Sequence, residues 1–315
     1  MTDNDGSWER SLVTKLATEA LAEQKRRRRW GIFFKFLTFA YVTFLLVTLI
    51  DWEGRAELSG GKKHTAMVEL NGIISPGADA SADKINTALQ AAFKDKNTQG
   101  VIMRINSPGG SPVQSQTIYD EMKRLRKKYP DIPLYVVVED ICASGGYFVA
   151  AGADKIYVSP SSIVGSIGVL MNGFGFTGLM DKLGVERRLV TAGEHKGMLD
   201  PFSPVDPKEV EYAKTLIKDV HQQFINVVKE GRGKRLKETP DMFSGLIWTG
   251  AKSVELGLAD GYGTLDTVAR DVIKAEDIVD YTQKEGFAEK VAKRFGASMA
   301  NAVVESALRA LPVMR

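Results

Sequence analysis

A basic cluster followed directly by a long apolar run sets the strongest constraint on how this chain folds. The cluster is Lys25–Arg29, and the run from Trp30 to Ile50 carries a single charged residue, Lys35, near its basic end. A helix of about 21 residues, at about 1.5 Å per residue, is roughly 30 Å long, which matches the hydrocarbon thickness of a bilayer. We therefore expect residues 30–51 to form a transmembrane helix.

The position of the basic cluster predicts the orientation of that helix. Positive charge stays on the cytoplasmic side, so residues 1–29 should form a cytoplasmic tail, with a short amphipathic helix over 8–24. The remainder should lie on the outer side of the membrane. A cleaved signal peptide has a shorter apolar core and a small-residue cleavage site, and a buried core helix shows a polar face. An uncleaved signal anchor fits residues 30–51 better than either.

The overall composition excludes several functional classes. Hydrophobic residues make up 44% and charged residues 26% of the 315 residues, as in an ordinary globular protein. A net charge of only +3 argues against a general nucleic-acid binder. The single cysteine, Cys142, excludes an intramolecular disulfide framework and a multi-cysteine metal site. With three histidines in the chain, we expect no metal and no cofactor.

Beyond a polar linker at 52–64, strand-like and helix-like segments alternate. The expected strands are 65–70, 100–105, 133–138 and 155–158, and the expected helices are 81–94, 112–128, 146–152 and 207–230. Apolar strands separated by amphipathic helices indicate an α/β fold with a parallel sheet covered on both faces. A short helix and a final strand or turn are expected over 250–263. We place the domain at 65–275 and a C-terminal helical tail at 276–315.

Two glycine-rich turns follow expected strands, and both are candidate sites. They are Ser107–Gly110 and Ala143–Gly146. In open α/β sheets, ligands bind beyond the carboxyl ends of the strands, where the chain turns into helices. Ser144 begins an apolar helix among free backbone N–H groups, which is the arrangement of a nucleophile beside an oxyanion hole. The alternative is that both segments are tight turns needed only for packing.

A serine nucleophile needs a base to accept its proton, and the residues alone leave that base open. The GxSxG motif is absent because Cys142 occupies its first glycine position. Ser-x-x-Lys begins at Ser59 and at Ser81, but neither is accompanied by the other motifs of that enzyme class. Two histidines lie in the linker and on the long helix, so His195 is the one in a loop-like segment.

Four motifs in order carry a resemblance to a known family. They are Asn106–Gly110, Ala143–Tyr147, Val164–Val169, and Gly193–Lys196 with the following Pro201–Phe202. Together they resemble the signal peptide peptidase A family, which are membrane-anchored Ser–Lys proteases with the Clp protease/crotonase-like fold. The resemblance covers roughly residues 65–265, and the length is similar to that of the short, single-repeat members.

The resemblance implies a role for each matching residue. Ser144 corresponds to the nucleophile, Lys196 to the general base and Ser166 to the hydroxyl that orients the lysine. The backbone N–H groups of Gly110 and Gly145 correspond to the oxyanion hole. A lysine acts as a base only when neutral, so its ordinary pKa of about 10.4 must fall through burial or a neighbouring cation. His195 departs from the family, where an aromatic residue is common before the lysine. Cys142 is expected to be a small buried residue.

The family also implies an assembly and a substrate. Its short members form ring-like homo-oligomers, octameric, in which neighbouring subunits supply the serine and the lysine. Its substrates are cleaved signal peptides and similar apolar, unstructured peptides. Three alternatives remain: a crotonase-like acyl-CoA enzyme on the same fold, an inactive oligomeric membrane scaffold, and an anchored protease with other targets, such as misfolded membrane proteins.

Overall fold

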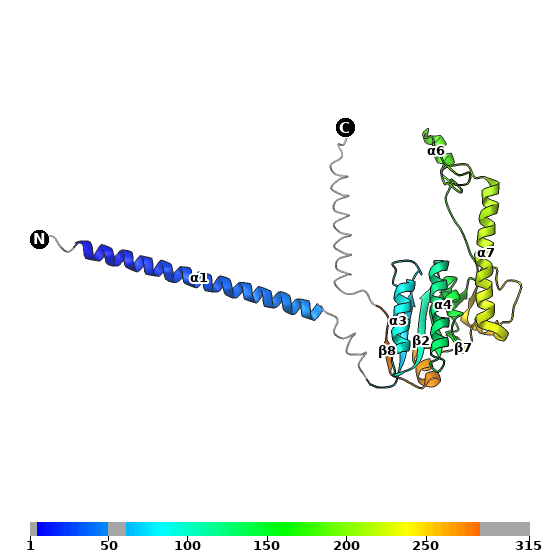
Figure 1. The fold of residues 1–315 in the computed structure, drawn as a ribbon, viewed down its shortest axis with the longest axis horizontal. Coiled ribbons are helices and arrows are strands. Elements are labelled where there is room, and N and C mark those ends of the chain that lie inside the picture. The colour runs from blue at the N-terminus through cyan, green and yellow to red at the C-terminus, as the bar shows by residue number, and fades with distance from the viewer. Residues whose placement is uncertain (1–4, 50–60, 284–315) are drawn as a thin grey trace. The chain divides into compact units, whose positions relative to one another are not determined.

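The computed structural model describes residues 5–49 and 61–283, which fall into two separate units. One unit contains α1 (Asp5–Leu49), a single continuous helix of 45 residues. The short amphipathic helix expected over 8–24 therefore continues without a break into the apolar run (Figure 1). The other unit contains all of the sheet and the candidate site.

The expected membrane anchor is described only in part. Within the described residues, no helix is both long enough and apolar enough to cross a membrane. Within the expected span 30–51, the side chains of 45–49 and the whole of residues 50 and 51 lie outside the described part. The linker as far as residue 60 and the helix expected from 287 onward also lie outside it.

Eight strands form one sheet in the described part of the chain. They are β1 (His64–Asn71), β2 (Thr98–Ser107), β3 (Leu134–Ala143), β4 (Lys155–Val158), β5 (Ile163–Gly165), β6 (Ile247–Thr249), β7 (Gly261–Tyr262) and β8 (Ile278–Asp280). The order is β6-β5-β3-β2-β1-β8, with β4 pairing to both β3 and β7. Every pair is parallel except β5–β6, so the expected parallel sheet is present with one antiparallel edge strand.

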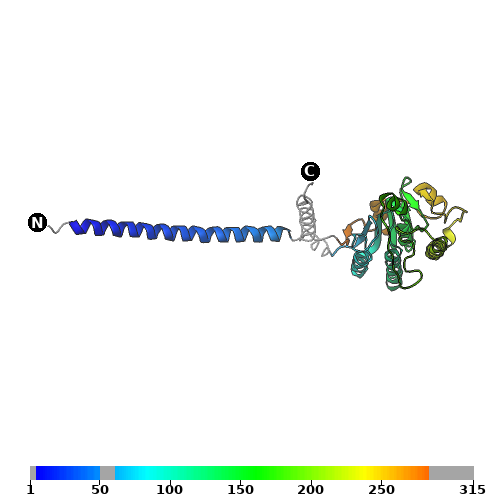
Figure 2. The same ribbon diagram turned by 90° about the horizontal axis from the view of Figure 1, so that it is seen from above.

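Helices cover the two faces of the sheet unequally. The main core packs under α3 (Ala82–Lys94), α4 (Pro112–Lys128), α5 (Gly145–Ala150) and α7 (Pro207–Arg232). The opposite face carries a much smaller cluster under the π-helical turn η3 (Val268–Ile273). Successive side chains of β2 point to opposite faces of the sheet, so Val101 and Met103 pack in the main core and Ile102 packs in the smaller cluster. In Figures 1 and 2, α3 and α4 lie side by side on the same face.

Four shorter helical segments complete the described elements. They are α6 (Thr177–Leu183), η2 (Gly233–Arg235), α8 (Gly250–Glu255) and α9 (Leu265–Thr267).

Local sequence signals explain where the two site-forming helices begin. The Ser111 side chain caps α4 by accepting a hydrogen bond from the Gln114 N–H, and Pro112 occupies the first turn. Asp206 caps α7 in the same way through the Lys208 N–H, and Pro207 follows it. Because a cap followed by proline is a strong start signal, both expected starts are confirmed.

The strand β3 divides the sheet and so positions the candidate nucleophile. Its first part, Tyr135–Val137, pairs with β4, and its last part, Ile141–Ala143, pairs with β5. Strands β4 and β5 thus diverge, and the chain emerges between β2 and β5 at the carboxyl end of β3. Ser144 is the next residue, at the edge of the sheet where ligands bind in such folds.

A long excursion, residues 169–206, separates β5 from α7, and we call it the arm. It contains α6, which lies beyond the N-terminal end of α7 and apart from the helices that cover the sheet (Figure 1). The arm exposes many large apolar side chains. The most exposed are Leu170, Phe174, Leu183, Val190 and Val205, between 68% and 93% accessible.

Two boundaries differ from the expectation. His64, which the sequence places at the end of the linker, is the buried first residue of β1. Its ring lies against Tyr281 and is 3.1 Å from the Tyr281 hydroxyl, so the strand starts earlier than its apolar residues suggest. Strand β8 pairs with β1 through residues 278–280, which lie beyond the expected domain limit at 275.

Candidate active site

Ser144 occupies a strained turn between β3 and α5. Its φ of 51° and ψ of −124° place a non-glycine residue in a region that L-amino acids rarely adopt. The turn is held by the Ser144 N–H, which donates to the Gly165 carbonyl at 2.8 Å, and by the Ser144 carbonyl, which accepts from the Phe148 N–H at 2.9 Å. A serine on a sharp strand-to-helix turn presents its hydroxyl as a nucleophile. Within the described residues, that hydroxyl has no hydrogen-bond partner.

The second glycine-rich turn packs directly against this serine. Gly109 has a φ of +100°, and a Cβ there would lie 2.7 Å from the Ser144 Cβ and 2.5 Å from the Gly145 nitrogen. Gly110 has a φ of +153°, and a Cβ there would collide with the Ile74 carbonyl. Since only glycine allows both the left-handed backbone and this close approach, the two turns expected from sequence form one site.

Two backbone amides at this junction are free to bind an anion. A Cβ on Gly145 would lie 3.1 Å from the Gly110 nitrogen, so the two residues are adjacent. Neither N–H donates a hydrogen bond within the described part of the chain. The Gly145 amide is also the first of a helix, where N–H groups have no partner in the helix. Such a pair is suited to stabilise the oxyanion of acyl transfer.

The serine and both amides open onto one cavity of about 750 Å³. It is lined by Gly110, Pro112, Val113, Ser115, Gln116, Thr117, Ser144, Gly145, Phe148, Ser166, Gly168, Val169, Leu170, Val220, Gln223, Phe224, Ser244 and Gly245. These residues come from α4, α5, α7, the turns after β2 and β3, the loop after β5 and the loop before β6. None of them is ionisable, so within the described chain this lining offers a serine hydroxyl and two free amides but no side chain that could act as a base.

Ser166 reaches the same cavity from the end of β5. Its φ of 50° is again left-handed, and its N–H donates to the Leu246 carbonyl at 2.8 Å. The structure therefore brings together Ser144, Ser166, Gly110 and Gly145, as the resemblance implied.

Lys196 does not reach this cavity from its own chain. It lies in a series of turns of the arm and is exposed to solvent, as is its neighbour His195. No described residue forms a hydrogen bond or ion pair with the Lys196 amine. Its role as the base consequently remains a prediction.

His221 is a residue near the site that sequence reasoning did not select. It lies on α7 between the cavity-lining residues Val220 and Phe224, and its Nε2 is 3.2 Å from the Ile167 carbonyl. Its sequence neighbours are an ordinary amphipathic stripe, so nothing in the pattern distinguished it. Cys142 is fully buried, and burial raises the pKa of its thiol, which fits the expected small core residue.

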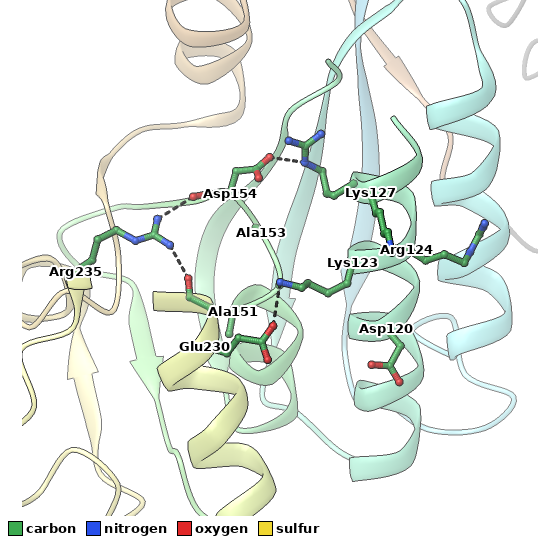
Figure 3. A pocket seen from close by; sticks show the side chains of 12 residues that line it. Asp120, Lys123, Arg124, Lys127, Ala151, Ala153, Asp154, Glu230 and Arg235 are labelled. Carbon is green, nitrogen blue, oxygen red and sulfur yellow. Dashed lines mark hydrogen bonds and ion pairs between the residues drawn. The ribbon is translucent and has the colours of Figure 1, made fainter. Parts of the chain in front are cut away.

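A second cavity, of about 720 Å³, lies among the ends of α4, α5 and α7 (Figure 3). Most of its charges are paired, with Lys123 3.2 Å from Glu230 and Arg126 2.7 Å from Asp154. Three helices end here, and a helix C-terminus carries partial negative charge that cations complement. The basic side chains therefore have a structural explanation, and this cavity is not the candidate site.

Two protein-family models and several known proteins match this chain. The Clp protease family model matches residues 66–164, and the peptidase family S49 model matches residues 126–279. A protein of Buchnera aphidicola named probable protease SohB is 31% identical over 253 residues, covering 80% of this chain and 73% of the relative. A relative from Enterococcus faecium, provisionally named signal peptide peptidase SppA, is 31% identical and covers 73% and 69% respectively.

A longer relative matches over only part of its length. A Brucella abortus protein named Na(+)/H(+) antiporter NhaA is 44% identical over 209 residues, which is 65% of this chain but 28% of that protein. The match thus spans less than a third of that relative.

The mixed α/β architecture, with its largely parallel sheet, agrees with the Clp protease-like fold of the matching family model. Within that class, the chain belongs to peptidase family S49.

Proposed function

We propose that this protein is a membrane-anchored serine endopeptidase that uses Ser144 as its nucleophile and Lys196 as its base. The observation that carries the proposal is the Ser144 turn itself. A strained serine, whose hydroxyl is free within the described residues, lies beside two free amides and lines a largely apolar cavity. Strain of this kind persists only where the surrounding structure enforces it, and it is concentrated at functional sites.

The geometry supports acyl transfer in two stages. The Ser144 oxygen attacks the scissile carbonyl while its proton passes to the neutral lysine amine, and the Gly110 and Gly145 amides stabilise the oxyanion. The lysine then protonates the departing amine as the carbon–nitrogen bond breaks. Water attacks the acyl-enzyme, and its proton returns through the lysine to Ser144 as the acid product leaves. The Ser166 hydroxyl orients the lysine throughout.

A second copy of the chain is the proposed source of the base. Among the described residues, none that lines the cavity is ionisable, and Lys196 lies on an arm whose apolar side chains are exposed. Exposed apolar surface of this extent is typical of an interaction site. An arm inserted into the neighbouring copy would bury both the apolar side chains and the amine, and burial favours a neutral lysine. We propose a ring-like homo-oligomer, with an octamer as the expected size.

The proposal also includes a class of substrate and a location in the cell. The cavity walls include Val113, Phe148, Val169, Leu170 and Phe224, which suit apolar, unstructured peptides such as cleaved signal peptides. The Enterococcus relative carries the name of such a peptidase. Residues 30–51 would anchor the chain in the inner membrane. The N-terminus would then be cytoplasmic, with the catalytic unit on the outer side.

The test uses full-length protein in detergent and a quenched apolar peptide. Four samples are compared: wild type, Ser144→Ala, Lys196→Ala, and the two variants unfolded and refolded together. Each single variant should lose at least about 1,000-fold in kcat, since the nucleophile and base act as a unit. The co-assembled sample should recover part of the activity, because mixed neighbours restore complete sites.

The other outcomes are equally informative. Loss in both variants without recovery would place the serine and lysine in one chain. Full activity of Ser144→Ala would overturn the mechanism. A wild type that cleaves no peptide, and whose Ser144 is not labelled by a fluorophosphonate, would favour a scaffold.

A further inference from the structure

His221 connects two parts of the candidate site that are distant in sequence. Its side chain reaches from the middle of α7 to the Ile167 carbonyl, 54 residues away, with a separation of 3.2 Å. Ile167 follows Ser166 directly, and the arm leaves the sheet just after it. The α7 residues around His221, namely Val220, Gln223 and Phe224, line the same cavity as Ser144. One hydrogen bond thus joins the α7 wall to the loop that carries Ser166.

The chemistry of this bond fixes the protonation of the ring nitrogen. A carbonyl oxygen only accepts hydrogen bonds, so Nε2 must carry the proton. The same nitrogen also carries a proton in the imidazolium form, so the bond forms in both protonation states.

The backbone that this bond holds is under strain. Ser166 has a φ of 50°, which a non-glycine residue adopts only when its neighbours enforce it. Three contacts do so: the Ser166 N–H donates to Leu246, the Gly168 N–H donates to the Ser166 carbonyl at 2.9 Å, and His221 donates to Ile167. The first comes from the loop before β6 and the second from the turn itself. The third is the one that connects this turn to α7.

We propose that His221 is a positioning residue, which fixes the positions of the Ser166 hydroxyl and the α7 wall relative to Ser144. This proposal rests on the proposed function, because Ser166 matters only if it orients the base of a Ser–Lys dyad. It assigns to the third histidine a role that neither the motifs nor the similarity to known proteins supplies.

The test compares three substitutions that differ in where they place a donor. Gln places its amide close to the position of Nε2, Asn places it close to Nδ1, and Leu has no donor. His221→Leu and His221→Asn should each lower kcat about tenfold, the effect of losing one aligned hydrogen bond. His221→Gln should stay within about threefold of wild type. KM should change little, because the cavity walls remain. Gln222→Leu, on the exposed side of α7, is the matched control.

A second measurement does not depend on turnover. Hydrogen–deuterium exchange in a peptide covering 166–169 should be faster in His221→Leu and His221→Asn than in wild type and His221→Gln, because the turn opens more often. Equal kcat and equal exchange in all four proteins would overturn the positioning role while leaving the dyad intact. Equal losses in Leu, Asn and Gln, with a lowered Tm, would also overturn it, since any change would then act through folding. An inactive wild type would instead overturn the proposed function.

Discussion

The turn that carries Ser144 and the arm that carries Lys196 are built in opposite ways. The turn emerges from the central strand of the sheet, and its backbone is fixed by hydrogen bonds from β5 and α5 and by close packing of Gly109. The arm exposes its apolar side chains, and Lys196 itself is exposed. A single chain therefore fixes the surroundings of Ser144, whereas it leaves Lys196 exposed and away from the cavity.

This difference concerns burial. Positive φ values at Ser144 and Ser166 are maintained by packed neighbours. The arm also holds a positive φ, 57° at Leu199, but that residue is exposed, and the exposed apolar side chains of the arm can be buried only against another surface. A catalytic site divided in this way would be inactive until assembly, which would restrict hydrolysis to the assembled form.

Among substitutions that leave the proposed dyad unchanged, the largest expected effect tests the close packing at the turn. Gly109→Ala would place a Cβ 2.5 Å from the Gly145 nitrogen and 2.7 Å from the Ser144 Cβ, so the two turns must separate. Displacing an oxyanion-hole donor lowers kcat by about 100- to 1,000-fold, and we expect a loss in that range. The measurement is kcat with the quenched peptide.

A matched glycine separates this steric effect from backbone strain alone. Gly77 has a φ of +75°, but a Cβ there would meet nothing within 4 Å. Gly77→Ala should cost about 1 kcal/mol of stability and leave kcat unchanged. A similar fall in kcat for both variants would show that the turn is not specifically packed for catalysis.

The next effect compares an ion pair of the core with one of the arm. The fully buried Arg232 side chain is 2.9 Å from Asp260, which also accepts the Ile156 N–H at 2.7 Å. Asp260→Asn would leave a buried cation without its partner, and we expect a loss on the order of 3 kcal/mol in the free energy of unfolding. On the arm, Arg187 lies 3.2 Å from Asp200, and Arg187→Met should leave the Tm almost unchanged.

The pH dependence of the core pair has a defined sign. Burial alone would raise the pKa of Asp260, but the hydrogen bond and charge of Arg232, with the Ile156 N–H, together hold that pKa below its ordinary value. A carboxyl whose pKa is lowered on folding stabilises the protein above its unfolded pKa of about 4, and this contribution is lost as the pH falls further. Wild type and Asp260→Asn should thus differ most near pH 7 and converge below about pH 4 in urea titrations. A constant difference would contradict this assignment.

The sequence could predict the features that depend on local signals, but not those that depend on tertiary contacts. The bounds of α4 and β4 follow from caps, proline and apolar runs, which are local signals, and the structure confirms them. Strands β5, β6 and β8 have only three residues each, too short for a periodic pattern, and they form through tertiary pairing. The motifs selected Ser144 and Gly110, and the structure places both of them on one cavity. His221 could not be selected, because its importance depends on a contact 54 residues away.

The smallest expected effect measures the strain at the nucleophile directly. A side chain held at the φ of 51° and ψ of −124° of Ser144 costs about 1–3 kcal/mol, whereas glycine adopts these angles freely. Glycine also makes the unfolded chain more flexible, which offsets about 0.4–1 kcal/mol. Ser144→Gly should therefore be about 1 kcal/mol more stable than Ser144→Ala in urea unfolding. For Lys196, exposed on the arm, the glycine variant should be no more stable than the alanine variant. If Ser144→Gly gained nothing over Ser144→Ala, the turn would not be storing strain, and the contrast between the two halves of the dyad would rest on exposure alone.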